Sequence, residues 1–361
     1  MRHYRIAVLP GDGIGHDVIT EGLQCLDLLA EAHDGFRLDT EIFDWSCTRY
    51  LHTGSMMPPD GLRVLTEFDA IYLGAVGFPT VPDHVSLWGM LLPIRQDFDL
   101  YVNQRPIRLL PGIEGPLRGR GPADVDFICV RENTEGEYAG IGGRVHQATP
   151  DEVALQTSVY TRRGVERIMR YAFALAEREG RKKVTSATKS NAQQYGPVLW
   201  DEIHAAVAAD YPGIATEKMH IDALAARFVT HPQTFEVVVA SNLFGDILTD
   251  LGGALQGSLG IPPSANFNPD PASRRGPALF EPVHGSAPDI AGQGIANPIG
   301  AIWSASLMLD YLGEHEAAAA LLRAIETVTA ARQVRTPDLG GTATTHDLGE
   351  AIRGALQTAA R

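Results

Sequence analysis

Short apolar segments alternate along this chain with longer segments of helical periodicity, and this alternation limits the fold more than any other feature. The apolar segments are consistent with buried strands at residues 5–9, 70–73, 127–130, 184–187 and 237–240. The helical segments lie at residues 17–32, 163–179, 197–209 and 317–331. Strands and helices in alternation are typical of α/β proteins. We therefore predict an α/β fold.

The length and two turn-rich stretches indicate two domains. At about 150 residues per domain, a chain of 361 residues predicts roughly two. Stretches rich in glycine and proline at residues 109–122 and 257–271 are candidate domain crossings. If both are crossings, the first and last thirds of the chain build one domain together. We expect a larger domain from residues 1–100 and 258–361, and a smaller one from residues 101–257.

Charge and cysteine content limit the partners. The 44 acidic and 30 basic residues give a formal net charge of −14, which repels nucleic acid and anionic membranes. The three cysteines have no metal-binding spacing, so a reducing compartment is expected. The first residues do not resemble a signal peptide, and no apolar run approaches the roughly 20 residues of a membrane span. We expect a cytoplasmic protein with neither nucleic acid nor a membrane as partner.

A glycine turn follows the first strand. Gly11, Gly13 and Gly15 are spaced G-x-G-x-G, whereas the dinucleotide fingerprint requires G-x-G-x-x-G. On this motif alone, a tight turn with positive φ explains the glycines better than a Rossmann site does.

Three arginines lie in unusual surroundings for an acidic chain. Arg95 ends an apolar run, Arg105 precedes a proline, and Arg131 directly follows a strand, where α/β proteins place binding residues. The planar guanidinium binds carboxylates through two hydrogen bonds, so three converging arginines would hold a dicarboxylic acid. The alternative is that each arginine neutralises a structural acid.

Asp246 and Asp250 are four residues apart and share one face of a predicted helix. No lysine or arginine occurs from residue 242 to 271, so the two carboxylates repel each other unless a cation lies between them. Oxygen ligands favour Mg²⁺ or Mn²⁺, and Asp222 is a candidate third ligand. The alternative is a solvated acidic face. Four apolar residues on the opposite face are expected to point into the core: Phe244, Ile247, Leu248 and Leu251.

Two further residues are candidate proton-transfer groups. Tyr138 lies on an acidic loop, and Lys189 follows a short strand. Either would serve in catalysis if a metal or neighbouring charge lowered its pKa.

Taken together, these segments resemble one family over nearly the whole chain. LPGDGIG, the three arginines, RENTEGEY, TKSN, SNLFGDILTDLGGALQGSLG and FEPVHGSAPDIAGQGIANPIGAI resemble the β-decarboxylating dehydrogenases. That family includes isopropylmalate, isocitrate, homoisocitrate and tartrate/D-malate dehydrogenases. The resemblance implies a two-domain α/β fold of the isopropylmalate/isocitrate dehydrogenase type, with a discontinuous first domain that binds the cofactor and no classical Rossmann fold. It also implies a homodimer whose interface, metal and catalytic residues belong to the smaller domain.

The resemblance implies roles for the matching residues. The substrate carboxylates would be bound by Arg95, Arg105 and Arg131. The metal, Mg²⁺ or Mn²⁺, would be bound by Asp222, Asp246 and Asp250. Lys189 would be the base that deprotonates the substrate hydroxyl, Tyr138 the acid that protonates the enolate, and Asp222 would assist catalysis. In members of this family, the residues that match Lys189 and Asp222 belong to the active site of the partner subunit.

The same resemblance implies NAD as the cofactor, because Asp289 is an acid where NAD-dependent members carry one for the adenosine ribose. A carboxylate there would repel a 2′-phosphate, and NADP-dependent isocitrate dehydrogenases have Lys-Tyr in place of Asp289-Ile290. K⁺ is left open as a further cation. The expected cofactor-binding residues are Asn191, Glu281, His284, Gly285, Ser286, Ala287, Asp289 and Asn297.

The segment before Arg95 implies the substrate. Its form, SLWG followed by LPIR, is similar to the tartrate/D-malate dehydrogenases, and no glutamate of the isopropylmalate type lies between Ala70 and Arg95. Trp88 and Leu91 would close the pocket around a small C3 substituent. We expect D-malate and tartrate as substrates, with 3-isopropylmalate as the alternative. A non-catalytic regulatory subunit is disfavoured, because the base, the acid and the metal ligands are all present.

Overall fold

The computed structural model describes residues 1–32 and 35–359 and divides into two compact units. Unit 1 comprises Met1–Leu100, Pro106–Val125 and Gly253–Arg361, and unit 2 comprises Tyr101–Arg105 and Asp126–Gly252. Residues 106–125 and 253–257 therefore group with the first unit, whereas the sequence analysis places them in the smaller domain. The reason is packing: Arg108 pairs with Glu326 at 2.7 Å, and Gly112 lies against the backbone of Thr329.

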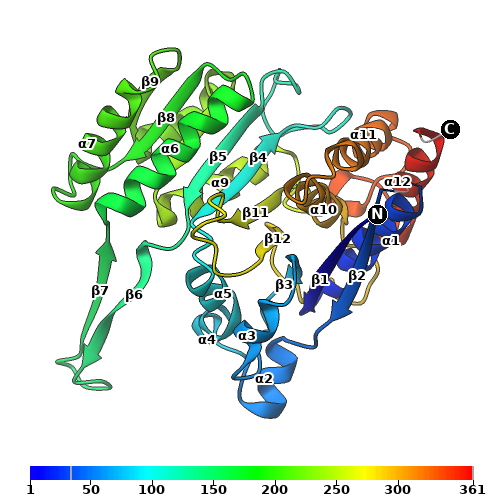
Figure 1. The fold of residues 1–361 in the computed structure, drawn as a ribbon, viewed down its shortest axis with the longest axis horizontal. Coiled ribbons are helices and arrows are strands. Elements are labelled where there is room, and N and C mark those ends of the chain that lie inside the picture. The colour runs from blue at the N-terminus through cyan, green and yellow to red at the C-terminus, as the bar shows by residue number, and fades with distance from the viewer. Residues whose placement is uncertain (33–34, 360–361) are drawn as a thin grey trace. The chain divides into compact units, whose positions relative to one another are not determined.

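Unit 1 contains a mixed sheet with the strand order β2-β1-β3-β12-β11. Its strands are β1 (Arg2–Gly11), β2 (Phe36–Ile42), β3 (Ala70–Ala75), β11 (Pro263–Phe267) and β12 (Ala278–Pro282). Only the β11–β12 pair is antiparallel among these described pairings. Its longer helices are α1 (Gly15–Ala32), α10 (Ile299–Tyr311), α11 (His315–Ala331) and α12 (Thr345–Ala359), which pack against one another (Figure 1).

Shorter helical segments lead up to Arg95 in unit 1, and the last of them, α5, carries it. They are α2 (Cys47–Thr53), α3 (Gly61–Leu65), α4 (Asp83–Ser86), a π-helical turn (Leu87–Leu91) and α5 (Leu92–Asp97). A buried apolar cluster, which includes Trp45, Met56 and Met90, connects them to β1 and β3. Arg95 is thus carried by a helix whose inner face is fixed in the core. β4 (Val102–Arg108) then begins in unit 2 and ends in unit 1.

Unit 2 contains parallel strands in the order β5-β10-β8-β9. Its strands are β5 (Asp126–Glu132), β8 (Lys183–Thr188), β9 (Ala215–His220) and β10 (Val237–Ala240). Its helices are α6 (Arg162–Arg178), α7 (Gly196–Ala209), α8 (Ile221–Thr230) and α9 (Asn242–Leu255). Strands β5, β8 and β10 are nearly continuous runs of buried residues, as expected where a sheet is covered on both faces, whereas the residues of β9 are exposed or half-buried. All the predicted strands and helices of both units are confirmed, with bounds shifted by a few residues.

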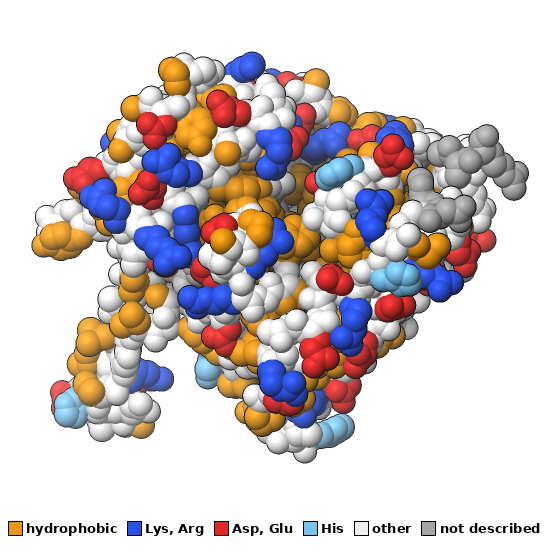
Figure 2. Space-filling view, in the orientation of Figure 1, with side chains coloured by type: hydrophobic (Ala, Val, Ile, Leu, Met, Phe, Trp, Pro, Cys, Tyr) orange, Lys and Arg blue, Asp and Glu red, His pale blue; other side chains and the backbone are white. Residues whose placement is uncertain are grey.

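A hairpin of β6 (Gly136–Val145) and β7 (Val153–Val159) projects from the body of unit 2 (Figure 1). Its exposed apolar side chains are Ile141, Val145, Val153 and Leu155. Figure 2 shows hydrophobic side chains gathered along this hairpin. Among the described helices, none is long and apolar enough to cross a membrane.

The glycine turn after β1 is a packing feature. Gly11 and Gly13 have φ values of 73° and 56°, so the preference for positive φ is confirmed. A Cβ on Gly13 would lie 2.0 Å from the backbone oxygen of Ser286. That oxygen accepts a hydrogen bond from the Ile14 amide at 2.9 Å. The turn therefore supports the loop that carries several candidate cofactor residues.

We expect Gly13→Ala to destabilise unit 1 by several kcal/mol, because it combines an unfavourable φ with a clash against backbone. Gly54→Ala is the matched control, since Gly54 has φ 77° but a Cβ at this position would meet no described atom within 4 Å. The control should cost only about 1 kcal/mol. Thermal and urea unfolding of both variants measure the difference. Equal losses would mean that the backbone contact with Ser286 contributes nothing.

Candidate active site

The candidate residues divide between the two units. Unit 2 holds Arg105, Arg131, Tyr138, Lys189, Asn191, Asp222, Asp246 and Asp250. Unit 1 holds Trp88, Leu91, Arg95, Glu281, His284, Gly285, Ser286, Ala287, Asp289 and Asn297. Each group is described within its own unit.

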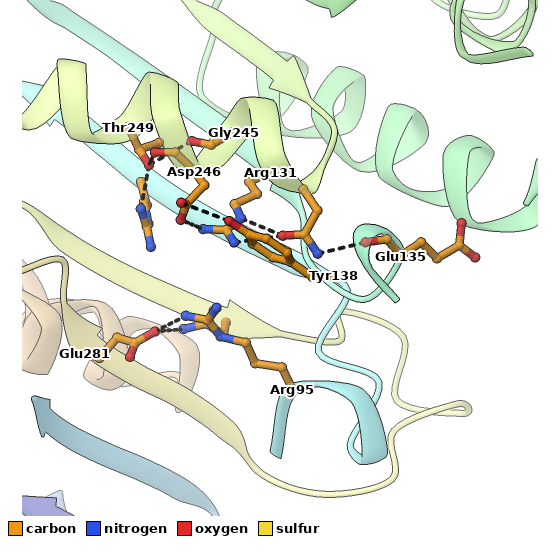
Figure 3. A network of polar contacts seen from close by, with 11 residues as sticks. Arg95, Arg131, Glu135, Tyr138, Gly245, Asp246, Thr249 and Glu281 are labelled. Atoms are coloured by element: carbon orange, nitrogen blue, oxygen red, sulfur yellow. Dashed lines mark hydrogen bonds and ion pairs between the residues drawn. The ribbon is translucent and has the colours of Figure 1, made fainter. Parts of the chain in front are cut away.

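Arg131 is the centre of the cluster in unit 2 (Figure 3). It lies near the end of β5 and is 1% exposed. Its Nη1 donates to Asp246 Oδ1 at 2.5 Å, while Nε and Nη2 donate to Asn242 Oδ1 at 3.0 and 2.7 Å. Tyr138 Oη donates to the second oxygen of Asp246 at 3.3 Å. A buried cation, a carboxylate and a phenol therefore form one connected group.

Helix α9 has a glycine at the point where the side chain of Arg131 crosses it. A Cβ on Gly245 would lie 2.6 Å from Cβ and Cγ of Arg131, so only glycine lets the arginine stem cross the helix here. One turn further along, Thr249 Oγ1 accepts from Arg105 Nη1 at 2.5 Å. Gly245 and Thr249 thus let one helix contact two of the three predicted arginines.

Tyr138 is held in its protonated form. Partial burial raises the pKa of Tyr138, and the carboxylate of Asp246 raises it further, while Arg131 lowers it. With a raised pKa, the phenol stays protonated at neutral pH and so carries a proton that it can donate. Tyr138 therefore suits the role of an acid.

Asp246 and Asp250 share one face of α9, as predicted. Partial burial raises the pKa of Asp250, and Asp246 raises it too, whereas Arg105 and Arg131 lower it. Repulsion between two carboxylates one turn apart is relieved by a cation between them, so these oxygens fit a Mg²⁺ or Mn²⁺ ion. The prediction for the opposite face is wrong for Ile247, which is 55% exposed.

Lys189 and Asp222 form a separate pair. Lys189 follows β8, Asp222 lies in the first turn of α8, and Lys189 Nζ donates to Asp222 Oδ1 at 2.8 Å. This hydrogen bond holds the pKa of Asp222 below its usual range. Within residues 1–32 and 35–359, no three acidic, histidine or cysteine residues form a metal-binding group. A single chain therefore does not assemble the three predicted aspartates.

Arg95 in unit 1 is buried and already paired with a carboxylate (Figure 3). Its Nη2 donates to Glu281 Oε1 at 2.6 Å, and Asn266 Nδ2 donates to the same oxygen at 2.9 Å. On the preceding π-helical turn, Trp88 is 42% exposed, whereas Leu91 is 8% exposed and belongs to the apolar core. Trp88 is therefore accessible to a ligand and Leu91 faces inward.

The candidate cofactor loop follows β12. His284 Nε2 is buried, and no hydrogen-bond partner for it occurs among the described residues. Burial lowers the pKa of His284, so the imidazole is neutral at pH 7. Asn297 Nδ2 donates to Asp338 Oδ2 at 2.9 Å, and Gly285 and Asp289 on the loop are exposed. A buried imidazole nitrogen and an exposed carboxylate on one loop are groups that fit a nucleotide. Asn191, in unit 2, is also exposed.

Comparison with known proteins defines the class. The sequence model for isocitrate/isopropylmalate dehydrogenase matches residues 5–352, and the chain belongs to this family. It is 55% identical to the D-malate dehydrogenase [decarboxylating] of Escherichia coli K12 over 98% of both chains. It is 53% identical to a probable tartrate dehydrogenase/decarboxylase of Agrobacterium vitis, over 99% of this chain and 97% of the relative. The predicted resemblance is confirmed.

A solved structure shows the same fold. Isocitrate dehydrogenase from Methylococcus capsulatus has a TM-score of 0.88 and 35% identity, covering 98% of this chain and 99% of that one. The predicted fold class is therefore confirmed. The named relatives are decarboxylating dehydrogenases, so the comparisons support an oxidoreductase.

Sequence reasoning missed Asn242, Gly245 and Thr249. A glycine inside a predicted helix is itself a signal, because it weakens the helix unless close packing requires it. Asn242 is the first residue of a helix that follows a buried strand, a position where a polar side chain reaches the end of the neighbouring strand. Thr249 carries no such signal.

The two helix aspartates should differ in stability effects when no metal is added. Asp246→Asn removes the charged partner of a buried arginine and should cost about 1–2 kcal/mol. Asp250→Asn should be neutral or stabilising at pH 7, because a raised folded pKa means that ionised Asp250 opposes folding. That gain should vanish as the pH falls below about 4, where the carboxyl is protonated.

Urea unfolding of both variants in EDTA at several pH values measures these effects. Equal, negligible changes in both would favour the solvated acidic face.

Proposed function

We propose that this protein catalyses the NAD-dependent oxidative decarboxylation of D-malate to pyruvate and CO₂, and also acts on tartrate isomers. The observation that carries the proposal is the buried Arg131, bound to Asp246 beside the protonated phenol of Tyr138. The cluster combines carboxylate recognition, two helix aspartates for a metal and an acid for the final proton. The tartrate and D-malate enzymes at 53–55% identity support the substrate.

The substrate assignment is supported by the residues before Arg95. Trp88 is a large exposed aromatic on the π-helical turn, where it would limit the C3 substituent to H or OH. Leu91 would act from the core beneath that turn. A bulkier C3 substituent would require Trp88 to move, so 3-isopropylmalate is the weaker candidate.

Each charged residue has a role in this proposal. Arg95, Arg105 and Arg131 bind the two substrate carboxylates, and Asp246, Asp250 and the partner subunit's Asp222 hold Mn²⁺ or Mg²⁺. The metal, when bound, polarises the substrate hydroxyl and stabilises the negative charge left after CO₂ departs.

Proton transfer would be divided between two side chains. Lys189, assisted by Asp222, would accept the hydroxyl proton, directly or through water, and NAD, when bound, would supply the acceptor for the C2 hydride. The resulting β-keto acid loses CO₂, and the electrons of the broken C–C bond form an enolate. Tyr138 then donates its phenolic proton to the enolate carbon. The raised pKa of Tyr138 supports this role, because the phenol remains protonated at neutral pH.

The cofactor would be NAD, bound by Glu281, Asn297, Asn191 and the loop that carries His284 and Asp289. Asp289 is exposed, and its carboxylate would accept from the ribose hydroxyls while repelling a 2′-phosphate. The neutral imidazole of His284 offers a buried nitrogen to the nucleotide. K⁺ remains an optional further cation.

A cytoplasmic homodimer with shared sites is part of the proposal. The Lys189–Asp222 pair and the Tyr138–Asp246 pair are distinct clusters within unit 2. This separation supports an active site in which one pair comes from each subunit of the dimer. The projecting hairpin exposes Ile141, Val145, Val153 and Leu155, and Ile247 on α9 is also exposed. Apolar groups of this kind favour burial against a second copy.

NADH should form from D-malate or a tartrate isomer when Mn²⁺ is present. EDTA should reduce the rate to background, and NADP should be a poor substitute for NAD. Absorbance at the NADH band, measured over a panel that includes 3-isopropylmalate, tests all three points. A clear preference for 3-isopropylmalate would overturn the substrate while leaving the reaction type in place.

Shared sites can be tested by mixing two inactive homodimers, Tyr138→Phe and Lys189→Ala. In a mixed dimer, one site collects both lesions and the other has neither. Random exchange makes about half the dimers mixed, so roughly a quarter of wild-type activity should return. If each site draws both residues from its own chain, every site keeps a lesion. Mixed dimers seen by native mass spectrometry without recovered activity would contradict sharing.

A further inference from the structure

Asn242 connects the two halves of the unit 2 cluster through a single amide group. It is the first residue of α9 and is 1% exposed. Its Oδ1 accepts both Nε and Nη2 of Arg131, at 3.0 and 2.7 Å. Its Nδ2 donates to the backbone oxygen of Glu135 at 2.9 Å. One side chain therefore contacts the arginine and also the loop that leads to Tyr138.

The two contacts on Arg131 fix the rotation of its guanidinium group. Because Asn242 occupies the edge formed by Nε and Nη2, Nη1 is directed at Asp246 Oδ1, which it reaches at 2.5 Å. The β5–β10 register places Ala240 beside Arg131, so the helix start follows two residues later. Backbone pairing thus brings Asn242 to the arginine before any ligand binds.

The contact on Glu135 anchors the loop before β6. The same loop is held by the Glu132 carboxylate, which accepts from the Thr134 and Glu135 amides at 3.0 and 2.8 Å. Gly136, the next residue, has φ 74° and packs against the Asn242 side chain. Asn242 therefore joins this loop to α9, the helix that carries Asp246, through a hydrogen bond.

An amide is suited to this position by its charge as well as its shape. A carboxylate at residue 242 would bind the same guanidinium edge, but it would neutralise Arg131 and weaken its attraction for other anions. An amide oxygen orients the guanidinium without adding charge, and only the amide also supplies a donor for the Glu135 oxygen.

We propose that Asn242 is a positioning residue that sets the orientation of Arg131 toward substrate and of the loop that carries Tyr138. This inference rests on the proposed function in assigning a substrate carboxylate to Arg131. It predicts that the amide oxygen of Asn242 affects substrate affinity by orienting Arg131. The amide nitrogen would affect proton donation by holding the loop that leads to Tyr138.

The test compares Asn242→Ala and Asn242→Asp with the control Val239→Ala. Val239 is a buried residue of β10 whose apolar side chain cannot form a hydrogen bond with Arg131. Asn242→Ala should raise KM for the dicarboxylate and lower kcat, reducing kcat/KM by at least about 10-fold more than the control does. Asn242→Asp keeps the acceptor and loses the donor, so kcat should fall. Its added negative charge should also raise KM, because it weakens the attraction of Arg131 for the dicarboxylate. Melting temperatures report stability separately.

A double-mutant cycle identifies the route of the effect. Lysine has no Nε–Nη2 edge, so Asn242→Ala should raise KM much less in an Arg131→Lys background than in the wild type. Calorimetric binding of the dicarboxylate provides the affinities if turnover is too slow. The same loss in both backgrounds, or kinetics equal to those of Val239→Ala, would overturn the inference.

The comparison does not depend on which dicarboxylate is turned over. If wild-type enzyme acts on 3-isopropylmalate and not on D-malate, the proposed substrate fails, and the Asn242 variants are compared on 3-isopropylmalate. If D-malate is turned over and the variants match the control, the proposed function stands and the positioning role is wrong.

Discussion

The ion pair between Arg131 and Asp246 is the interaction on which the unit 2 site depends. A guanidinium that is 1% exposed must have charged or polar partners, because an unpaired buried charge is strongly destabilising. Asp246 supplies the opposite charge, and Asn242 supplies a further acceptor. The position of Arg131 also requires glycine at residue 245, because any side chain there would clash with the arginine where it lies against α9. Three residues of one helix are thus determined by one arginine on a neighbouring strand.

Much of this organisation was accessible from the sequence. Parallel strands that are buried on both faces have continuous apolar sequences, and this pattern locates β5, β8 and β10 correctly. The spacing of Asp246 and Asp250 was sufficient to place both on one helix face. The spacing of the glycine turn distinguishes it from a dinucleotide fingerprint. The positive φ values of Gly11 and Gly13 explain why glycine occurs at these two positions.

The parts that failed depend on contacts between distant segments. Residues 106–125 were assigned to the smaller domain by composition, but their partners, such as Glu326, lie more than 200 residues further along. Ile247 fits the helical periodicity of a core position and is nevertheless exposed, because periodicity reports spacing and does not identify the face that packs. Asn242 resembles any polar residue at a helix start until its bonds to Arg131 are seen.

The two interpretations of the arginines turn out not to exclude each other. Arg95 holds the carboxylate of Glu281, and Arg131 holds that of Asp246, so both neutralise acids of the chain itself. Burying these cations beside carboxylates means that part of their dehydration has already occurred during folding. A dicarboxylate that binds such an arginine replaces or joins an existing carboxylate contact, and the arginine keeps its hydrogen-bonded orientation throughout. In a chain with a net charge of −14, the same contacts would keep the proposed anion-binding groups in place although the long-range field opposes the approach of an anion.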